Sequence, residues 1–206
     1  MTAAAAHPHP SLTSPIVLVL AAGRGQRFTA SGGSTHKLQA PLLGKPVLQH
    51  VLDTVAQAGL QAHVVRPSGA GTAGMGDSIA LGVGATPQAA GWLILPGDMP
   101  VVRASTLRQV AQTLLTSKGC AAVQPVCDGI PGHPVAFSAE CGTALKQLTG
   151  DLGARAVLQQ LRKEGRVLQL PVDDPGILQD IDTLDDLHRA QKMLAQDVSA
   201  LQPSPQ

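Results

Sequence analysis

The feature that most constrains the fold of this chain is an alternation of short apolar runs with longer helix-like segments. The runs PIVLVLAA (Pro15–Ala22) and WLILP (within Gly91–Pro100) are continuous and aliphatic, which is typical of strands buried on both faces of a sheet. Further strands are expected over 62–67, 120–126, 133–138 and 166–172, and helices over 46–60, 104–119, 152–165 and 182–196. Such alternation predicts a three-layer α/β/α, Rossmann-like fold with a mostly parallel, mixed sheet.

Composition limits the class of protein. The 206 residues are 44% hydrophobic and 14% charged, so we expect a single domain over 15–197 between disordered tails at 1–14 and 198–206. A net charge of +1 argues against a nucleic-acid partner, and no apolar run approaches the roughly 20 residues of a membrane-spanning helix. Three cysteines without a CxxC pair (Cys120, Cys127, Cys141) fit reduced thiols in the cytoplasm.

The first predicted strand ends abruptly in the glycine- and arginine-rich stretch LAAGRGQRF. Phe28 stands where the dinucleotide fingerprint G-x-G-x-x-G requires its third glycine, and Pro46 follows Gly44-Lys45 where a Walker A loop requires Ser or Thr. Both common phosphate loops are therefore excluded. The remaining pattern is A-A-G-x-G-x-R, with a further basic residue at Lys37.

Such a loop has two interpretations. Small residues let backbone N–H groups approach a phosphate or a base, and Arg24, Arg27 and Lys37 would neutralise a triphosphate. The alternative is a glycine-rich connection with solvated arginines, and the loop alone does not decide between them. Because ligands of such sheets bind beyond the carboxyl ends of the strands, the turn GDMP at Gly97–Pro100 is expected to face the same crevice.

Six segments in order resemble the MobA-like nucleotidyltransferases, and among these the molybdenum cofactor cytidylyltransferases. They are LAAGRGQRF, GMGDSIALGV, LILPGDMPVV, GHPVAF, LTGDLGARAVL and DIDTLDDL, and the resemblance spans Ile16 to Leu187. It implies a nucleotidyltransferase fold and the transfer of CMP from CTP to the phosphate of a molybdopterin-type cofactor, with release of pyrophosphate. It also implies Mg²⁺ as the cofactor and a molybdoenzyme as a docking partner.

Carboxylates after two of the predicted strands are the candidate metal ligands. Asp98 follows the strand WLILP, and Asp180 and Asp182 are two residues apart in DIDTLDD. Mg²⁺ prefers oxygen ligands, and the resemblance places the metal on these three aspartates. Alternatively, Asp182 caps the last helix and Asp185 is a first-turn acid. Which of Asp180 and Asp182 would bind the metal stays open.

The resemblance also assigns the remaining site residues. It implies catalytic roles for Arg27, Lys37 and Asp98. It implies nucleotide contacts from Leu20, Ala21, Ala22, Gly23, Arg24, Gly25, Lys37, Gly76 and Ser78. Asp77 or Ser78 is the expected cap of a short helix there. Ala22 stands where guanylyltransferase relatives have glycine, which favours CTP.

Acceptor contacts are expected from His133, Asp151 and Arg155, although a turn histidine and a solvated helix arginine are simpler interpretations. Two other functions fit the same motifs. One is transfer to a sugar phosphate or polyol phosphate, and the other is non-catalytic binding or delivery of a cofactor to a molybdoenzyme.

Two departures from the family pattern are visible. The gap between Arg27 and Lys37 is ten residues, about twice the usual spacing, and its glycine-rich stretch TASGGSTH is expected to be a mobile flap without nucleotide. Only SGAGTA separates HVVRP from GMGDS, where relatives often carry a helix and a strand. The sheet is therefore expected to be one strand shorter.

Overall fold

The computed structural model describes residues 14–23, 25–66 and 74–200. The tails expected at the two ends lie outside these residues, apart from residue 14 and the last turn of the final helix. The strands are β1 (Ile16–Leu20), β2 (Pro41–Leu42), β3 (Lys45–Pro46), β4 (Gln61–Val65), β5 (Gly91–Pro96), β6 (Ala122–Cys127), β7 (Ile130–Pro131), β8 (Val135–Ser138) and β9 (Val167–Pro171). The helices are α1 (Gln26–Ala30), α2 (Val47–Gln57), α3 (Met75–Ala85), α4 (Ala104–Thr116), α5 (Gly142–Lys146), α6 (Arg155–Lys163) and α7 (Leu184–Ala200), with 3-10 turns η1 (Lys37–Gln39), η2 (Ala139–Cys141) and η3 (Pro175–Leu178).

The central sheet is mixed and mostly parallel, which confirms the expected fold class. Its order is β4-β1-β5-β8-β6-β7, with β9 beside β6. β1 pairs in parallel with β4 and β5, and β6 pairs in parallel with β9, whereas β8 runs antiparallel to both β5 and β6. β4 forms one edge, and no further strand lies beyond it among the described residues. This agrees with the short connection between β4 and α3.

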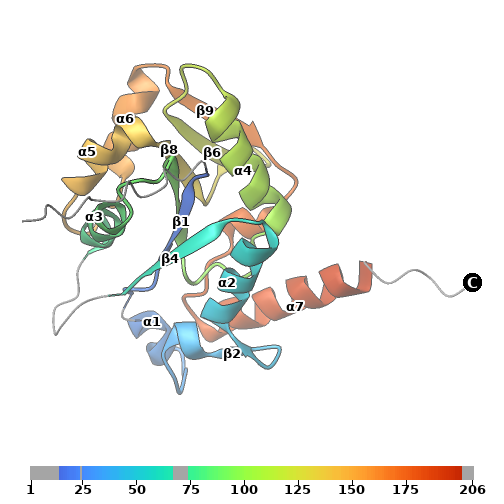
Figure 1. The fold of residues 1–206 in the computed structure, drawn as a ribbon. Helices are drawn as coiled ribbons and strands as arrows, with labels where there is room; N and C mark the ends of the chain where they lie inside the picture. The colour runs from blue at the N-terminus through green and yellow to red at the C-terminus, as the bar shows by residue number, and fades with distance from the viewer. Residues whose placement is uncertain (1–13, 24, 67–73, 201–206) are drawn as a thin grey trace, which may run out of the picture.

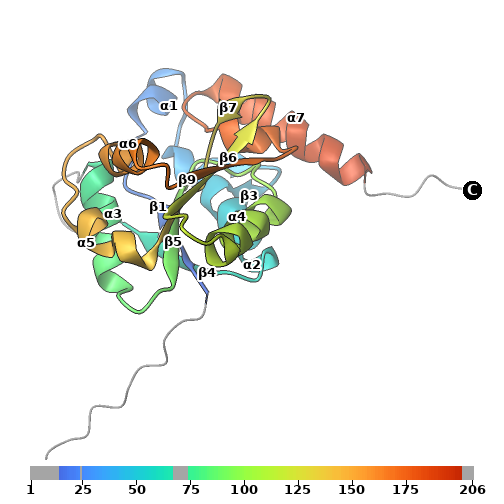
Figure 2. The same ribbon diagram turned by 90° about the horizontal axis from the view of Figure 1, so that it is seen from above.

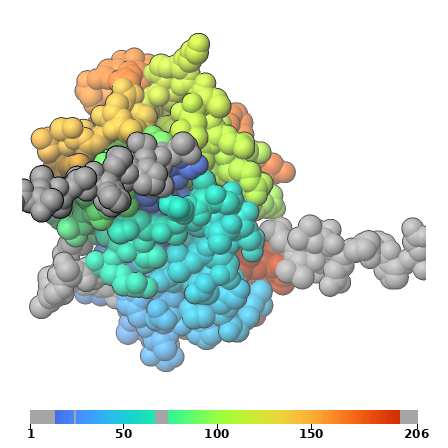
Figure 3. All heavy atoms as spheres, viewed as in Figure 1, coloured from blue at the N-terminus to red at the C-terminus, as the bar shows by residue number. Residues whose placement is uncertain are grey.

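Helices cover both faces of the sheet. α3, α5 and α6 lie on one face, and α2, α4 and α7 lie on the other, as the two ribbon views agree (Figures 1 and 2). Figure 3 shows α2 and α4 side by side on the outer surface. Residues of β1 alternate between the two resulting cores, since Val17 and Val19 pack on the α2–α4 side while Ile16 and Leu18 pack on the α3 side. The unbroken aliphatic run is therefore a strand buried on both faces, as predicted.

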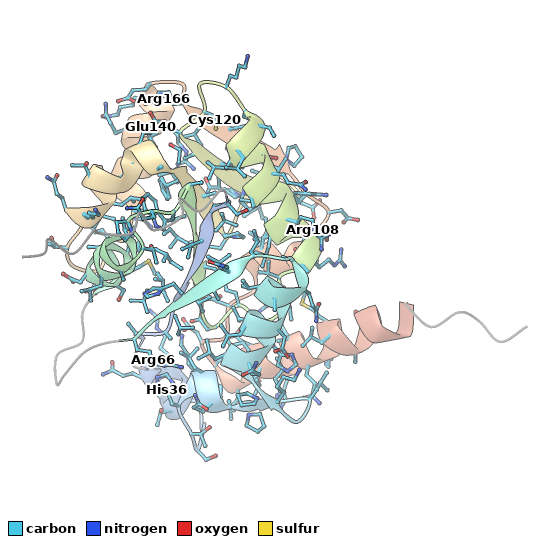
Figure 4. All side chains as sticks on the ribbon, in the orientation of Figure 1. His36, Arg66, Arg108, Cys120, Glu140 and Arg166 are labelled. Carbon is cyan, nitrogen blue, oxygen red and sulfur yellow. The ribbon has the colours of Figure 1, made fainter. Side chains whose placement is uncertain are left out.

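The carboxyl ends of the parallel strands gather at one end of the molecule. Leu20 at the end of β1 pairs with Pro96 at the end of β5 and with Val65 at the end of β4. In Figure 4, Arg66 and His36 mark this end. The ion pair of Arg166 with Glu140 (2.6 Å) lies at the opposite end. The end marked by His36 is the one where the sequence predicts a ligand.

The segment expected to be a mobile flap follows α1 and consists mainly of turns. Its first two residues end α1 (Gln26–Ala30), and Phe28, the residue just before the segment, is only 1% exposed. The Ser31 hydroxyl accepts a hydrogen bond from the amide of Leu184 (3.0 Å) at the start of α7. Residues 31–36 form turns that are exposed except at Gly33, and Ser31 ties them to α7; their mobility without nucleotide stays a prediction.

Two further observations concern the cysteines and the hydropathy of the helices. Cys120, Cys127 and Cys141 are free thiols, as expected from their spacing. Within the described part of the chain, no helix has the combined length and hydropathy that crossing a bilayer requires.

Asp174 holds the loop before η3 against α4. Its side chain is 1% exposed and accepts hydrogen bonds from the amide of Arg103 (2.9 Å), the hydroxyl of Thr106 (2.6 Å) and the amide of Gly176 (3.0 Å). The η3 turn in turn packs beneath the segment of His133, whose amide donates to the carbonyl of Ile177 (3.0 Å). Asp174 thus positions a wall of the site described below.

Replacing Asp174 with Ala should destabilise the protein by roughly 3 kcal/mol, because buried donors lose a charged acceptor. The matched control is Asp173→Ala, since Asp173 is exposed and a surface change of this kind is expected to stay within about 0.5 kcal/mol. Urea unfolding midpoints of the two variants and the wild type measure the difference. Equal midpoints for both variants would show that the Asp174 hydrogen bonds are not needed for stability.

Candidate active site

A cavity of about 820 Å³ lies at the carboxyl ends of β1 and β5. Segments that are distant in sequence line it: the loop after β1, the turn after β5, the start of α3, the β7–β8 connection, and the residues after η3. Ten of the residues predicted for the site line this cavity, namely Leu20, Ala22, Gly23, Lys37, Ser78, Asp98, His133, Asp151, Asp180 and Asp182. The crevice expected from parallel-sheet topology is therefore present.

Lys37 is the centre of the polar part of this cavity. Its Nζ lies 2.6 Å from Oδ2 of Asp98 and 2.7 Å from Oδ1 of Asp182, and the residue is only 8% exposed. Burial alone would lower the pKa of Lys37, but the charges of Asp98 and Asp182 and their hydrogen bonds outweigh it and raise that pKa above its usual value. The side chain is therefore a fixed ammonium group at neutral pH.

The local structure before Lys37 explains how it reaches the cavity across ten residues. His36 donates from Nε2 to the carbonyl of Gly23 (2.7 Å) and accepts at Nδ1 from the amide of Leu38 (3.3 Å). This pair of roles fits a neutral ring protonated at Nε2. His36 thus ties η1 to the loop after β1 and brings the lysine beside Gly23. No sequence pattern marks His36 as a site residue, since it is a single histidine in a polar loop.

Backbone hydrogen bonds bring the two aspartate segments together. The amide of Gly97 donates to the carbonyl of Leu20, and the amide of Ile181 donates to the carbonyl of Asp98, each at 2.9 Å. The turn after β5 is thereby joined to the end of β1 on one side and to the segment before α7 on the other. Asp98 and Asp182 meet because both segments are anchored to the same strand ends.

Thr183 and Asp186 form the cap of α7. Oδ2 of Asp186 accepts from the amide of Thr183 (2.7 Å) and from the amide of Asp182 (3.1 Å), and the Thr183 hydroxyl accepts from the amide of Asp186 (3.2 Å). This is a reciprocal capping arrangement. The alternative in which Asp182 caps the helix is therefore wrong, whereas Asp185 does lie in the first turn of α7, as expected. The side chain of Asp182 is free to face the cavity.

The aspartates differ in their surroundings. The hydrogen bond from Lys37 is the largest cause that lowers the pKa of Asp182, and Arg27 adds to it through an ion pair of 2.8 Å. Burial and the charges of Asp98 and Asp182 raise the pKa of Asp180. Asp182 is the partner of Asp98 in the cluster, while Asp180 lies at its edge. Arg27 is itself mostly exposed and contacts the cluster from outside the cavity.

The same atoms test whether a divalent cation fits this chain. Among the described residues, no three His, Cys, Asp or Glu side chains are arranged to hold a metal by themselves. Oδ1 of Asp98, however, is buried without a hydrogen-bond partner, and the Lys37 ammonium stands as a cation between two carboxylates. Mg²⁺ is commonly held by one or two carboxylates and completed by waters and substrate phosphates. The donor set fits a cation that enters together with a phosphate ligand.

The start of α3 differs from the sequence prediction in detail. Gly74, not Asp77 or Ser78, is the N-cap, and the Ser78 hydroxyl donates to the carbonyl of Gly74 (3.1 Å). Gly76 does not line the cavity; a Cβ there would lie 2.7 Å from the carbonyl oxygen of Thr149. The glycine at 76 is thus needed for close packing rather than for exposing backbone to a base.

Asp77 joins two walls of the cavity. Its Oδ2 accepts from the amides of Gly74 and Gly150, each at 2.9 Å, and the amide of Gly76 donates to the carbonyl of Gly150 (2.7 Å). A Cβ at Gly74 would lie 2.3 Å from the backbone of Gly150. The turn that carries Asp151 is therefore clamped to the start of α3.

The remaining predicted residues are placed as follows. His133 and Asp151 line the cavity, whereas Arg155 lines a second cavity beside it. Burial lowers the pKa of His133, and its Nδ1 is buried without a partner. Ala21 donates its amide to the carbonyl of Val65 (2.9 Å), and Gly25 caps α1 behind Lys37, so neither lines the cavity. Arg24 lies outside the described residues.

A buried lysine between carboxylates at the strand ends, beside a loop of small residues, defines a phosphate-handling α/β protein. The chain belongs to the family described as the MobA-like NTP transferase domain, whose model matches residues 17–167.

Comparison with individual proteins supports this assignment. The chain is 32% identical over 188 residues to the bifunctional protein GlmU of Stenotrophomonas maltophilia, which covers 81% of this chain and 38% of GlmU. It therefore spans well under half the length of that curated relative. Among solved structures it is similar to Rv0371c of Mycobacterium tuberculosis, with 26% identity, a TM-score of 0.67, and coverage of 88% of this chain and 98% of the other. The same protein has been solved in complex with manganese.

The molybdopterin-guanine dinucleotide biosynthesis protein A of Archaeoglobus fulgidus shares the fold. Its identity is 20% and its TM-score 0.58, over 88% of this chain and 99% of that one. The resemblance read from the sequence motifs is thus confirmed at the level of the family and the fold.

The position of the Lys37 ammonium leads to a test of metal binding. Lys37→Met keeps the length of the side chain but leaves Asp98 and Asp182 without their shared counterion. We expect the variant to bind Mn²⁺, without nucleotide, at least about tenfold more tightly than the wild type, equivalent to about 1.4 kcal/mol. Isothermal titration calorimetry measures this directly.

Two control variants separate this effect from a general loss of positive charge. Lys45→Met removes a lysine that pairs with Asp53 outside the cavity, and Arg27→Met removes a cation that touches only Asp182. Both should leave the Mn²⁺ affinity within about twofold of the wild type, since exposed ion pairs contribute little. Unchanged affinity in Lys37→Met would mean that Lys37 does not occupy the position of the cation.

Proposed function

We propose that this protein is a nucleotidyltransferase that transfers CMP from CTP to the phosphate of a molybdopterin-type cofactor and releases pyrophosphate. The observation that carries the proposal is the buried Lys37 ammonium, 2.6 Å from Asp98 and 2.7 Å from Asp182, in a cavity whose wall is the small-residue loop after β1. Apolar side chains would pack at these positions at a lower desolvation cost, so packing does not explain the cluster. It is suited to binding polyphosphate.

The proposed reaction needs little covalent chemistry from the protein. An oxygen of the acceptor phosphate forms a bond to the α-phosphorus of the nucleotide, and the bond from that phosphorus to the β-phosphate oxygen breaks. Pyrophosphate carries the electron pair away. The cavity walls hold the two reactants in line, and Lys37 neutralises the charge that develops on the leaving group. Arg27, at the outer edge of the cluster, adds to this charge neutralisation.

A divalent cation, Mg²⁺ in this proposal, would be held by Asp98 and Asp182, with Asp180 at the edge of the site. When bound, the cation supplies charge neutralisation at the phosphates. The manganese complex of Rv0371c supports this proposal. For the ammonium to yield its place, Lys37 must turn from the carboxylates to the phosphates of the nucleotide. The flexible four-carbon side chain of Lys37 allows this movement.

Several finer points rest on the motif resemblance. Ala22 lines the cavity, and its methyl group leaves less room for a purine, which supports CTP. Docking on a molybdoenzyme and a cytoplasmic location are further parts of the proposal. A sugar phosphate or polyol phosphate acceptor is the nearest alternative reaction. Delivery of a bound cofactor without catalysis is the alternative from another class, and the intact cluster of Lys37, Asp98 and Asp182 disfavours it.

The base and the acceptor can be tested in one assay. The protein is incubated with Mg²⁺, molybdopterin cofactor and each of the four nucleoside triphosphates in turn, and pyrophosphate release is measured. We expect release with CTP to exceed release with GTP by about tenfold, because a small steric difference in a binding pocket is worth about 1–3 kcal/mol. A preference for GTP would overturn the cytidylyl assignment. No release with any triphosphate would favour the delivery function.

The role of Asp98 can be separated from its contribution to stability. Asp98→Asn should reduce the turnover number at least about 100-fold, because the amide cannot provide a charged ligand at the reacting phosphates. The melting temperature should change little, since Lys37 keeps Asp182 as its partner. Asp53→Asn, which breaks the ion pair with Lys45 outside the cavity, is the control and should retain activity. Retained activity in Asp98→Asn would leave Asp98 as a turn residue only.

A further inference from the structure

A second cavity of about 460 Å³ adjoins the first. It shares four lining residues with the first: Met75, Pro131, His133 and Asp151. It lies between α3 and α6, over β5, β8 and β6. A ligand that occupied both cavities would pass His133, and its part in the second cavity would lie away from the Lys37 cluster. The volume is within the range of small-molecule sites.

The floor of this second cavity is apolar apart from one residue. Ile94 on β5 pairs directly with Val135 on β8, and Phe137 and Ile79 are fully buried beside them. Hydroxyl groups placed against such surfaces would lose hydrogen bonds to water without replacement, at a cost of about 1–3 kcal/mol each. The floor therefore suits a body with flat, apolar faces and disfavours a sugar ring or a polyol chain.

The exception is Gln124 on β6, which is only 8% exposed. It lies two residues beyond Ala122, the partner of Phe137, and therefore on the same face of the sheet as the apolar floor. Its Oε1 accepts a hydrogen bond from Nη2 of Arg162 on α6. A buried amide paired with a guanidinium provides a polar end to an otherwise apolar cavity.

One face of α6 lines this cavity. Arg155, Leu158 and Arg162 are spaced three and four residues apart, which places them on one face of the helix, and all three line the cavity. A guanidinium has five N–H donors in a fixed fork, so the bond to Gln124 leaves others for a ligand. Carbonyl and carboxylate groups are the natural partners of such donors.

We propose that the second cavity holds the body of the phosphorylated acceptor, and that Gln124 and Arg162 determine acceptor specificity. The inference rests on the proposed function, since it concerns the acceptor of that reaction. The acceptor class that fits is a flat heterocycle whose far edge carries carbonyl-type hydrogen-bond acceptors, with its phosphate directed past His133 to the Lys37 cluster. A sugar phosphate or polyol phosphate does not fit this site.

The surroundings of the cavity support an amphipathic ligand. Met75 and Leu152 line it and are 43% and 72% exposed. The turn with Leu152 is clamped to α3 through the Asp77 hydrogen bonds described above, so this apolar rim has a fixed position. Covering it would remove apolar area from water, which favours binding of a body with apolar faces.

Binding of the acceptor body can be measured without turnover. The probe is 6-hydroxymethylpterin, a bicyclic heterocycle with a carbonyl edge, titrated by its own fluorescence, and glucose 1-phosphate is the comparison ligand, titrated by calorimetry. We expect the wild type to bind the pterin at least tenfold more tightly than the sugar phosphate. Arg162→Met should weaken pterin binding at least tenfold, and Gln124→Leu, which suits the apolar floor, should weaken it in the same direction.

The matched control is Lys163→Met, because Lys163 carries the same charge on the same helix and lines neither cavity. It should bind the probe as the wild type does, and thermal unfolding checks that each variant is folded. In turnover, Arg162→Met should raise the KM for the acceptor at least tenfold and change the KM for the triphosphate less than twofold. Equal binding of the two ligands, or pterin binding insensitive to both Arg162→Met and Gln124→Leu, would overturn the inference.

The outcomes also separate this inference from the proposed function. If the protein binds the probe through Arg162 but releases no pyrophosphate with any acceptor, the proposed reaction is contradicted. The preference of the second cavity for a flat heterocycle is then supported. Pyrophosphate release that is unaffected by Arg162→Met would contradict the specificity role and leave the reaction standing.

Discussion

The contact of one ammonium with two carboxylates is the interaction on which the site depends. Lys37 comes from the segment after α1, Asp98 from the turn after β5, and Asp182 from the residues before α7. Lys37 inside the cavity and Arg27 outside it face three carboxylates, those of Asp98, Asp182 and Asp180, and Oδ1 of Asp98 is buried without a partner. Burying such groups costs free energy unless they are fully paired. The incomplete pairing is what makes the cavity receptive to a further cation.

The rest of the fold holds these charges in place. The aliphatic strands β1 and β5 form a rigid support, and backbone hydrogen bonds from Gly97 and Ile181 join the adjoining turns. Thr183 and Asp186 cap α7 and so leave Asp182 for the cluster. On the other side, Phe28 anchors α1 in the core, at the start of the long connection to Lys37. Carboxylates that are held in place in this way need little rearrangement when a cation arrives.

The two cavities divide the chemistry of the ligands between them. The first combines small residues with a charged cluster, which suits phosphates, and the second combines apolar walls with the polar end formed by Gln124 and Arg162. The clamp of Asp77 on Gly74 and Gly150 fixes part of the wall that the two cavities share. An enzyme that joins two different substrates needs both environments side by side, with the reacting phosphates at their junction.

The fold class, the order of the longer strands and helices, and the family could be predicted from the sequence, whereas the short elements β2, β3, β7, α1 and α5 were not. Val17 and Leu18 could be assigned to a doubly buried strand because an unbroken aliphatic run has few other stable settings, and the motifs around Asp98, Lys37 and Asp182 were visible as residue types in order. Three features emerge from the folded structure alone: Lys37 bridges the two aspartates, Thr183 and Asp186 rather than Asp182 cap α7, and Gly76 serves packing against Thr149. It also revealed the pairing of Gln124 with Arg162 across 38 positions of the chain. Local propensity and periodicity report on neighbours along the chain, whereas these contacts depend on how distant segments meet in space.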